Sequence, residues 1–87
     1  MTIYMVQREL KGISPADLAA AQQLAIKGAK DYTEKGVPMR YIRSTFAPED
    51  ARCMCLFEAN STEEVKRLNQ EAKIPFVRVV EALDLTP

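Results

Sequence analysis

Cys53 and Cys55 are the only thiols in this 87-residue chain, and their spacing is the first feature that could support chemistry. They lie two residues apart in a predicted strand, where successive side chains point to opposite sides. Both thiols therefore face one side, where they could act as soft metal ligands but could not readily bridge each other. A closed zinc site needs about four ligands, so two subunits would have to pool their thiolates. We therefore assign no metal site and expect both cysteines to be buried packing residues.

The chain contains no histidine, and this excludes several kinds of catalytic centre. Histidine is the usual general base near neutral pH and the commonest ligand of transition metals. Without it, neither a Ser-His-Asp triad nor a Cys-His dyad can form. Carboxylates are then the remaining candidates for acid–base chemistry.

Two carboxylates with possible cationic or phenolic partners form the candidate ligand-binding group. Glu58 shares a side of its strand with Met54 and Leu56, and Glu81 alternates with apolar residues. An apolar sheet face disfavours a bare carboxylate charge, so an arginine or tyrosine should meet it. With the second thiol included, the candidate ligand-binding residues are Arg8, Tyr41, Arg43, Cys55, Glu58 and Glu81. The polar members either line a pocket between the sheet and a partner subunit, or form salt bridges near strand ends that only orient the subunits.

Four strands are expected to position these residues. Alternating apolar and polar residues predict strands over 3–9, 37–46, 52–59 and 77–83. Pairing in the second strand should begin after Pro38, because proline cannot donate a hydrogen bond to the sheet. In that strand Met39, Tyr41 and Arg43 are expected to share one side.

Two helices are expected between the strands. Ser14 as N-cap and Pro15 at the first helical position begin a helix that ends near Glu34. Ser61 and Glu64 predict a capping box for a second helix over 62–72. Asn69 lies one residue from the apolar stripe of that helix, so its side chain could face either the sheet or solvent.

The predicted order β-α-β-β-α-β is that of a ferredoxin-like α+β sandwich, a four-stranded antiparallel sheet with both helices on one face. The length fits a single domain over residues 1–87. Several strands are apolar on both sides, so the sheet face without helices needs a cover. A homodimer packed through this open sheet face, as in an αβ-barrel dimer, is the economical arrangement.

Composition disfavours several partners. Twelve basic and twelve acidic residues cancel, whereas nucleic acid and anionic membranes attract clustered positive charge. The sequence has no signal-peptide pattern and no apolar run of about 20 residues, and free thiols suit a reducing compartment. We therefore expect a cytoplasmic protein that binds neither nucleic acid nor membranes.

Several short motifs resemble those of a known family. They are Tyr4-Met5-Val6-Gln7-Arg8, Tyr41-Ile42-Arg43-Ser44, Cys55-Leu56-Phe57-Glu58-Ala59, Ser61-Thr62-Glu63-Glu64-Val65, Ile74-Pro75 and Arg78-Val79-Val80-Glu81. Together they are similar to a small domain-of-unknown-function family whose best-described members are nickel-binding, ferredoxin-like homodimers. The resemblance implies a dimer with a metal or small-ligand site. The chain departs from the family at Tyr41, where members usually have tryptophan, and near Leu68, where they commonly have histidine. Histidine-based nickel coordination therefore cannot be transferred to this chain.

These observations favour a non-enzymatic, dimeric module that binds a small ligand or a metal in a stress response, with no resident cofactor. The alternative is a cofactor-free isomerase or monooxygenase of the dimeric αβ-barrel type. In that enzyme Arg8, Arg43 and either Glu58 or Glu81 would polarise and deprotonate a small carbonyl or phenolic substrate. A third possibility is a purely structural subunit of a larger assembly.

Overall fold

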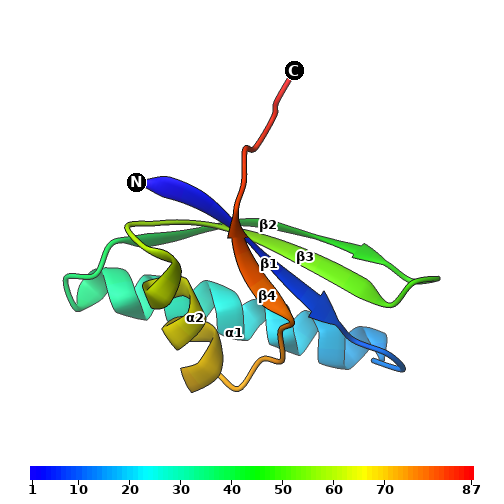
Figure 1. The fold of residues 1–87 in the computed structure, drawn as a ribbon. Coiled ribbons are helices and arrows are strands. Elements are labelled where there is room, and N and C mark those ends of the chain that lie inside the picture. The colour runs from blue at the N-terminus through cyan, green and yellow to red at the C-terminus, as the bar shows by residue number, and fades with distance from the viewer.

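Both helices lie on one face of a four-stranded antiparallel sheet, and the other face of the sheet has no helix (Figure 1). The computed structural model covers residues 1–87. Its elements are β1 (Thr2–Glu9), α1 (Pro15–Glu34), β2 (Met39–Ala47), β3 (Arg52–Ala59), α2 (Thr62–Glu71) and β4 (Arg78–Glu81). The strand order is β2-β3-β1-β4. The predicted ferredoxin-like α+β fold is confirmed.

The predicted starts of both helices are confirmed by their caps, and α2 ends at Glu71, one residue before the predicted end. Ser14 Oγ accepts a hydrogen bond from the backbone N–H of Asp17 at 3.1 Å, and Ser61 Oγ accepts one from Glu64 at 3.2 Å. Each bond satisfies one of the free N–H groups of a first helical turn. Gly36 follows α1 with a φ of +90°, a left-handed conformation that favours glycine. Neither helix is long and apolar enough to cross a membrane.

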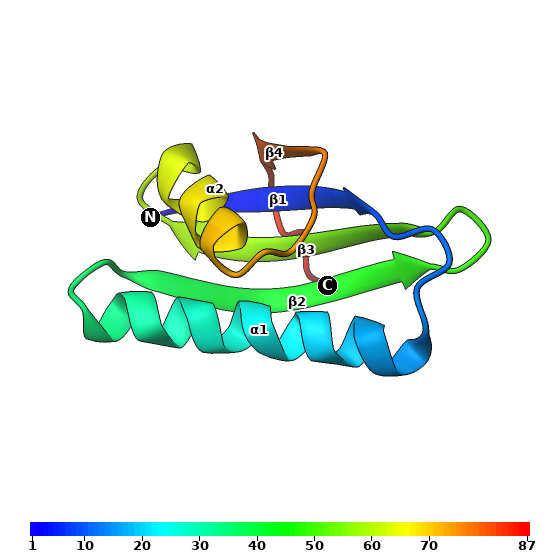
Figure 2. The same ribbon diagram turned by 90° about the horizontal axis from the view of Figure 1, so that it is seen from below.

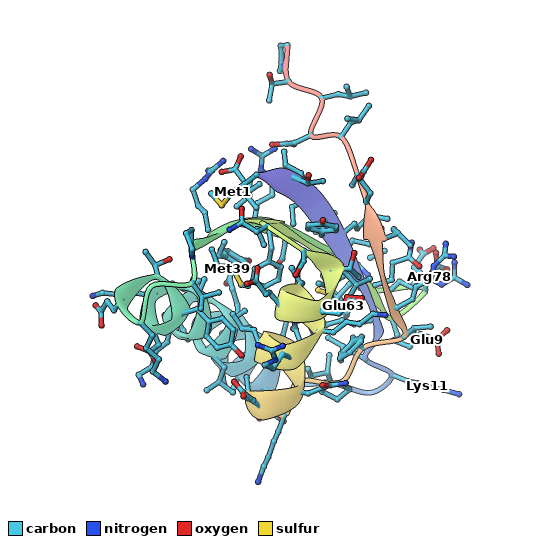
Figure 3. The ribbon with its side chains drawn as sticks, turned by 60° about the vertical axis from the view of Figure 1, so that its left-hand side comes forward. Met1, Glu9, Lys11, Met39, Glu63 and Arg78 are labelled. Atoms are coloured by element: carbon cyan, nitrogen blue, oxygen red, sulfur yellow. The ribbon has the colours of Figure 1, made fainter.

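The hydrophobic core fills the layer between the helices and the sheet. α1 runs along β2, while α2 covers the half of the same face that is formed by β1 and β4 (Figure 2). Phe57 and Val6 from the sheet and Val65 from α2 are completely buried. Figure 3 shows Met39 in the layer between the sheet and the helices, with Arg78 at the far edge. Both cysteines belong to this core, as predicted.

A bulge in β2 changes which residues share a face. Tyr41 pairs with Phe57, but the next paired residue is Arg43, opposite Leu56, so Ile42 is an extra residue in the strand. One extra residue reverses the alternation of every side chain that follows it. Tyr41 therefore faces the helices and Arg43 faces the open side. The prediction that these two residues share one side is wrong.

The last strand is shorter than predicted, Arg78–Glu81 rather than 77–83. The backbone N–H of Ala82 still donates to the carbonyl of Ile3 at 2.9 Å, after which the chain leaves the sheet. Asp84 then lies 2.9 Å from Arg43 on β2, at the opposite edge of the sheet. The C-terminal tail, residues 82–87, therefore leaves the sheet on the open side and projects away from the helices (Figure 1).

Candidate functional site

Arg8 is an almost fully buried cation at the centre of the candidate site. It follows Tyr4 and Val6 on the helix-facing side of β1 and is only 3% exposed. Its guanidinium donates from Nε to Cys55 Sγ at 3.4 Å, and from Nη2 to Asn69 Oδ1 at 2.6 Å. The third bond runs from Nη1 to the carbonyl of Pro75 at 3.2 Å. No carboxylate forms an ion pair with Arg8. Cys55 is therefore the one partner that can carry a compensating negative charge.

Cys55 is held in an environment that favours its thiolate. Its Sγ lies 3.8 Å from Cys53 Sγ and accepts a hydrogen bond from Ser44 Oγ at 2.9 Å. The hydrogen bond from Cys53 lowers the pKa of Cys55 to about 5 against the opposing effect of burial, with the charge of Arg8 and the bonds from Ser44 and Arg8 contributing further. The same shared hydrogen bond, with burial, raises the pKa of Cys53. The two donors that point at Cys55 Sγ, from Arg8 and Ser44, therefore favour the thiolate at Cys55 rather than at Cys53.

A chain of side chains orients the Ser44 hydroxyl. Ser44 Oγ lies 2.5 Å from the Tyr41 hydroxyl, which accepts a bond from Gln22 Nε2 of α1 at 3.1 Å. The Tyr41 ring packs edge-on against Phe57, with ring centroids 5.5 Å apart. These contacts fix the phenol, because the ring is packed and its hydroxyl is bonded on two sides. Tyr41 therefore acts on the thiolate indirectly, through Ser44.

The two thiols line a pocket between α1 and the sheet. Its volume is about 140 Å³. Leu10, Leu18, Ala21 and Phe46 supply its apolar wall. Arg8, Ser44, Gln22 and both thiols supply its polar surface. The pocket therefore offers sulfur and a fixed positive charge to a small ligand.

The structure divides the six predicted site residues into two groups. Arg8, Tyr41 and Cys55 are brought together on the helix-facing side. Glu58 lies on the open face in an ion pair with Arg40 at 3.2 Å, and Arg43 pairs with Asp84. Glu58 and Glu81 both line a separate hollow of about 470 Å³ beside the C-terminal tail. The expected single cluster of Arg8, Tyr41, Arg43, Glu58 and Glu81 is therefore wrong. Strand alternation separates Arg8 from Glu58, and the bulge separates Tyr41 from Arg43.

This division also bears on the enzyme alternative. The enzyme alternative requires Arg8, Arg43 and a carboxylate to act on one substrate. Arg8 lies on the helix-facing side of the sheet, whereas Arg43 and Glu58 lie on the open face. The ion pairs of Glu58 and Arg43 instead match the alternative in which these charges form salt bridges. No observation in the structure supports the enzyme reading.

Asn69 is the site residue that the sequence left undecided. It is completely buried, and its Nδ2 donates to the Val65 carbonyl at 2.8 Å while its Oδ1 accepts from Arg8. The sequence does contain a signal for this contact. Arg8 shares one side of its strand with Tyr4 and Val6, and this is the buried side of β1. A buried guanidinium needs acceptors from the covering helix. A polar residue beside the apolar stripe of α2 is the natural acceptor.

The donor set does not fit nickel(II). Imidazole is a suitable ligand for nickel, and the chain has none. No group of three or more thiol or carboxylate residues lies close enough together to hold a metal ion. The two thiols remain the one close pair of soft donors in a pocket.

Comparison with known proteins places the chain in a family. The family model described as "Nickel responsive protein SCO4226-like" matches residues 4–82. The crystal structure of SCO4226 from Streptomyces coelicolor A3(2) has 22% sequence identity and a TM-score of 0.78, covering 97% of this chain and 99% of that one. At this identity the likeness shows a common fold. No curated protein matches the chain. The residues matched by the family model span almost the whole sequence, so the chain belongs to the family of nickel-responsive, SCO4226-like proteins.

Proposed function

We propose that the protein is a dimeric binding module of a stress response, which takes a metal ion or a small ligand into the pocket beside Cys53 and Cys55. One observation carries this proposal. A buried guanidinium, Arg8, and the Cys55 sulfur to which it donates meet at the wall of a pocket of about 140 Å³. Charged groups are costly to bury, so a charged pair lining a cavity is a candidate binding site.

Membership of a nickel-responsive family supports the metal-binding form of the proposal. The residues of this chain direct it away from nickel, because they offer sulfur and no imidazole. The protein would therefore keep the fold and the metal-responsive role of the family with a different donor set.

The open sheet face supports the dimer. It presents Ile3, Met5, Met54, Leu56 and Val80, all of them only partly buried in the single chain. Leu83 and Leu85 of the C-terminal tail, which leaves the sheet on this side, are 82% and 85% exposed. A partner packed sheet to sheet would remove these apolar side chains from water. We propose this open face as the dimer interface, on the opposite side of the sheet from the pocket.

Both cysteines are free thiols. Free thiols persist in a reducing compartment. This supports a cytoplasmic location.

A ligand panel tests the proposal. The purified protein is titrated calorimetrically with nickel(II), zinc(II), copper(I) and small apolar acids, and its thermal unfolding is followed with each. A ligand present at about 100 times its Kd adds about 2.7 kcal/mol to the free energy of unfolding. We expect at least one member of the panel to bind and raise Tm in the wild type but not in the C53S/C55S double variant. Absence of binding by every member would contradict the proposal.

A further inference from the structure

We propose that Cys53 and Cys55 together chelate one monovalent soft metal ion, copper(I), in each subunit. This inference rests on the proposed function, because it names the ligand class of the same pocket. It stands on three features of the site, namely the distance between the sulfurs, the charge count around them and the number of available donors.

The sulfur atoms are already at a chelating distance. The Sγ atoms of Cys53 and Cys55 are 3.8 Å apart, and both line the same pocket. A three-coordinate ion with metal–sulfur bonds of about 2.3 Å and angles of about 120° holds its two sulfurs roughly 4.0 Å apart, so its third position would face the pocket and take a neutral exogenous donor. One ion could therefore replace the hydrogen bond between the sulfurs without moving the strand. Cys53 would lose its thiol proton to solvent, and two metal–sulfur bonds would form.

The charge count favours a monovalent ion. Two thiolates and one monovalent cation form a complex of charge −1, which the guanidinium of Arg8 compensates, since its Nε is 3.4 Å from Cys55 Sγ. A divalent ion on the same two thiolates would leave the charge of Arg8 uncompensated. Arg8 is almost fully buried, so an uncompensated positive charge there would be costly.

The number of donors favours the same ion. Zinc(II) sites usually have four ligands, and no further thiol or carboxylate joins the two cysteines. The sulfurs lie on the helix-facing side, so a partner on the open sheet face would add no ligand. Soft thiolates select copper(I), which would hold the two thiolates and one exogenous donor in a three-coordinate arrangement. The expected stoichiometry is therefore one ion per chain.

Competition with a chromophoric copper(I) chelator, without oxygen and with a reductant, tests this inference. The proteins are the wild type, C53S, C55S and M54L. Met54 supplies the matched control, because it is a sulfur-containing residue of the same strand that faces the open side. We expect the wild type and M54L to take up one copper(I) per chain, and each cysteine variant to bind about 100-fold more weakly or worse, because chelation by a second donor adds at least that factor.

Parallel titrations with zinc(II) and nickel(II) separate the possible failures. Binding of zinc(II) or nickel(II) as tight as that of copper(I), or copper(I) binding that survives in C53S and C55S, would overturn the inference while leaving the proposed function standing. If the wild type binds no metal and no small acid, the proposed function fails as well. R8K keeps the charge and should still prefer copper(I) over zinc(II). R8M should prefer copper(I) less strongly than the wild type does, and an unchanged ratio of the two affinities in R8M would refute the charge argument.

Discussion

Replacing Asn69 by leucine tests whether the buried Arg8 depends on its helix acceptor. The Asn69 Oδ1 atom accepts the shortest of the three Arg8 hydrogen bonds, at 2.6 Å, and the asparagine is completely buried. Leucine has no acceptor, so the hydrogen bond to Arg8 is lost. Because leucine fills a similar volume, no water can enter to replace that bond. An unsatisfied donor on a buried charged group costs about 2 kcal/mol. For a domain of this size that lowers Tm by about 10 °C.

A double-mutant cycle separates this bond from changes in packing. R8M alone leaves Asn69 Oδ1 without its donor, whereas R8M/N69L removes both partners and places apolar groups of similar shape together. We expect the double variant to be about 2 kcal/mol more stable than the sum of the single effects predicts. The assay is urea unfolding followed by circular dichroism at fixed protein concentration, with the m-value checked for constancy. A cost for N69L below about 0.5 kcal/mol, or strict additivity in the cycle, would refute the reasoning.

Four further predictions follow from other parts of the molecule. S61A should cost about 1 kcal/mol in thermal unfolding, because it removes the cap of α2, and an unchanged Tm would show that the cap contributes nothing. G36A should cost about 1 kcal/mol, because φ is +90° there, and a stabilised variant would contradict this. L56D should convert the proposed dimer to monomers in sedimentation measurements, and a persistent dimer would exclude the open face as its interface. Alkylation of Cys55 by iodoacetamide should have a midpoint near pH 5 that moves upward in R8M, since the pKa of Cys55 is about 5, and a wild-type midpoint near the ordinary value of 9 would be inconsistent with a thiolate.

The sequence predicted the elements well where local chemistry determines them. Serine caps mark both helix starts, and the predicted strand over 52–59 coincides with β3 because its two ends are bounded by turn and cap residues. β4 was predicted too long, because apolar residues continue into the C-terminal tail although pairing with β1 ends at Tyr4 and Glu81. Composition alone does not indicate where a neighbouring strand ends.

The candidate site was only partly predictable, for two physical reasons. The bulge at Ile42 is hidden within a run of residues that all favour strands, so simple alternation placed Tyr41 and Arg43 together. The contact between Arg8 and Asn69 joins residues 61 apart in the chain and depends on how α2 lies over β1. Neither local propensity nor spacing contains that information. The candidate residues correctly include both Arg8 and Cys55, but they also include Arg43 and Glu58, which lie on the open face.

X-ray absorption at the copper edge of the copper(I)-loaded protein tests the central claim most directly, because it reports which atoms surround the metal. The arrangement of Cys53 and Cys55 predicts two sulfur neighbours in the wild type and in M54L, and loss of this signal in C53S and C55S. A first shell dominated by nitrogen or oxygen in the wild type would contradict the claim that this sulfur pair is the binding site.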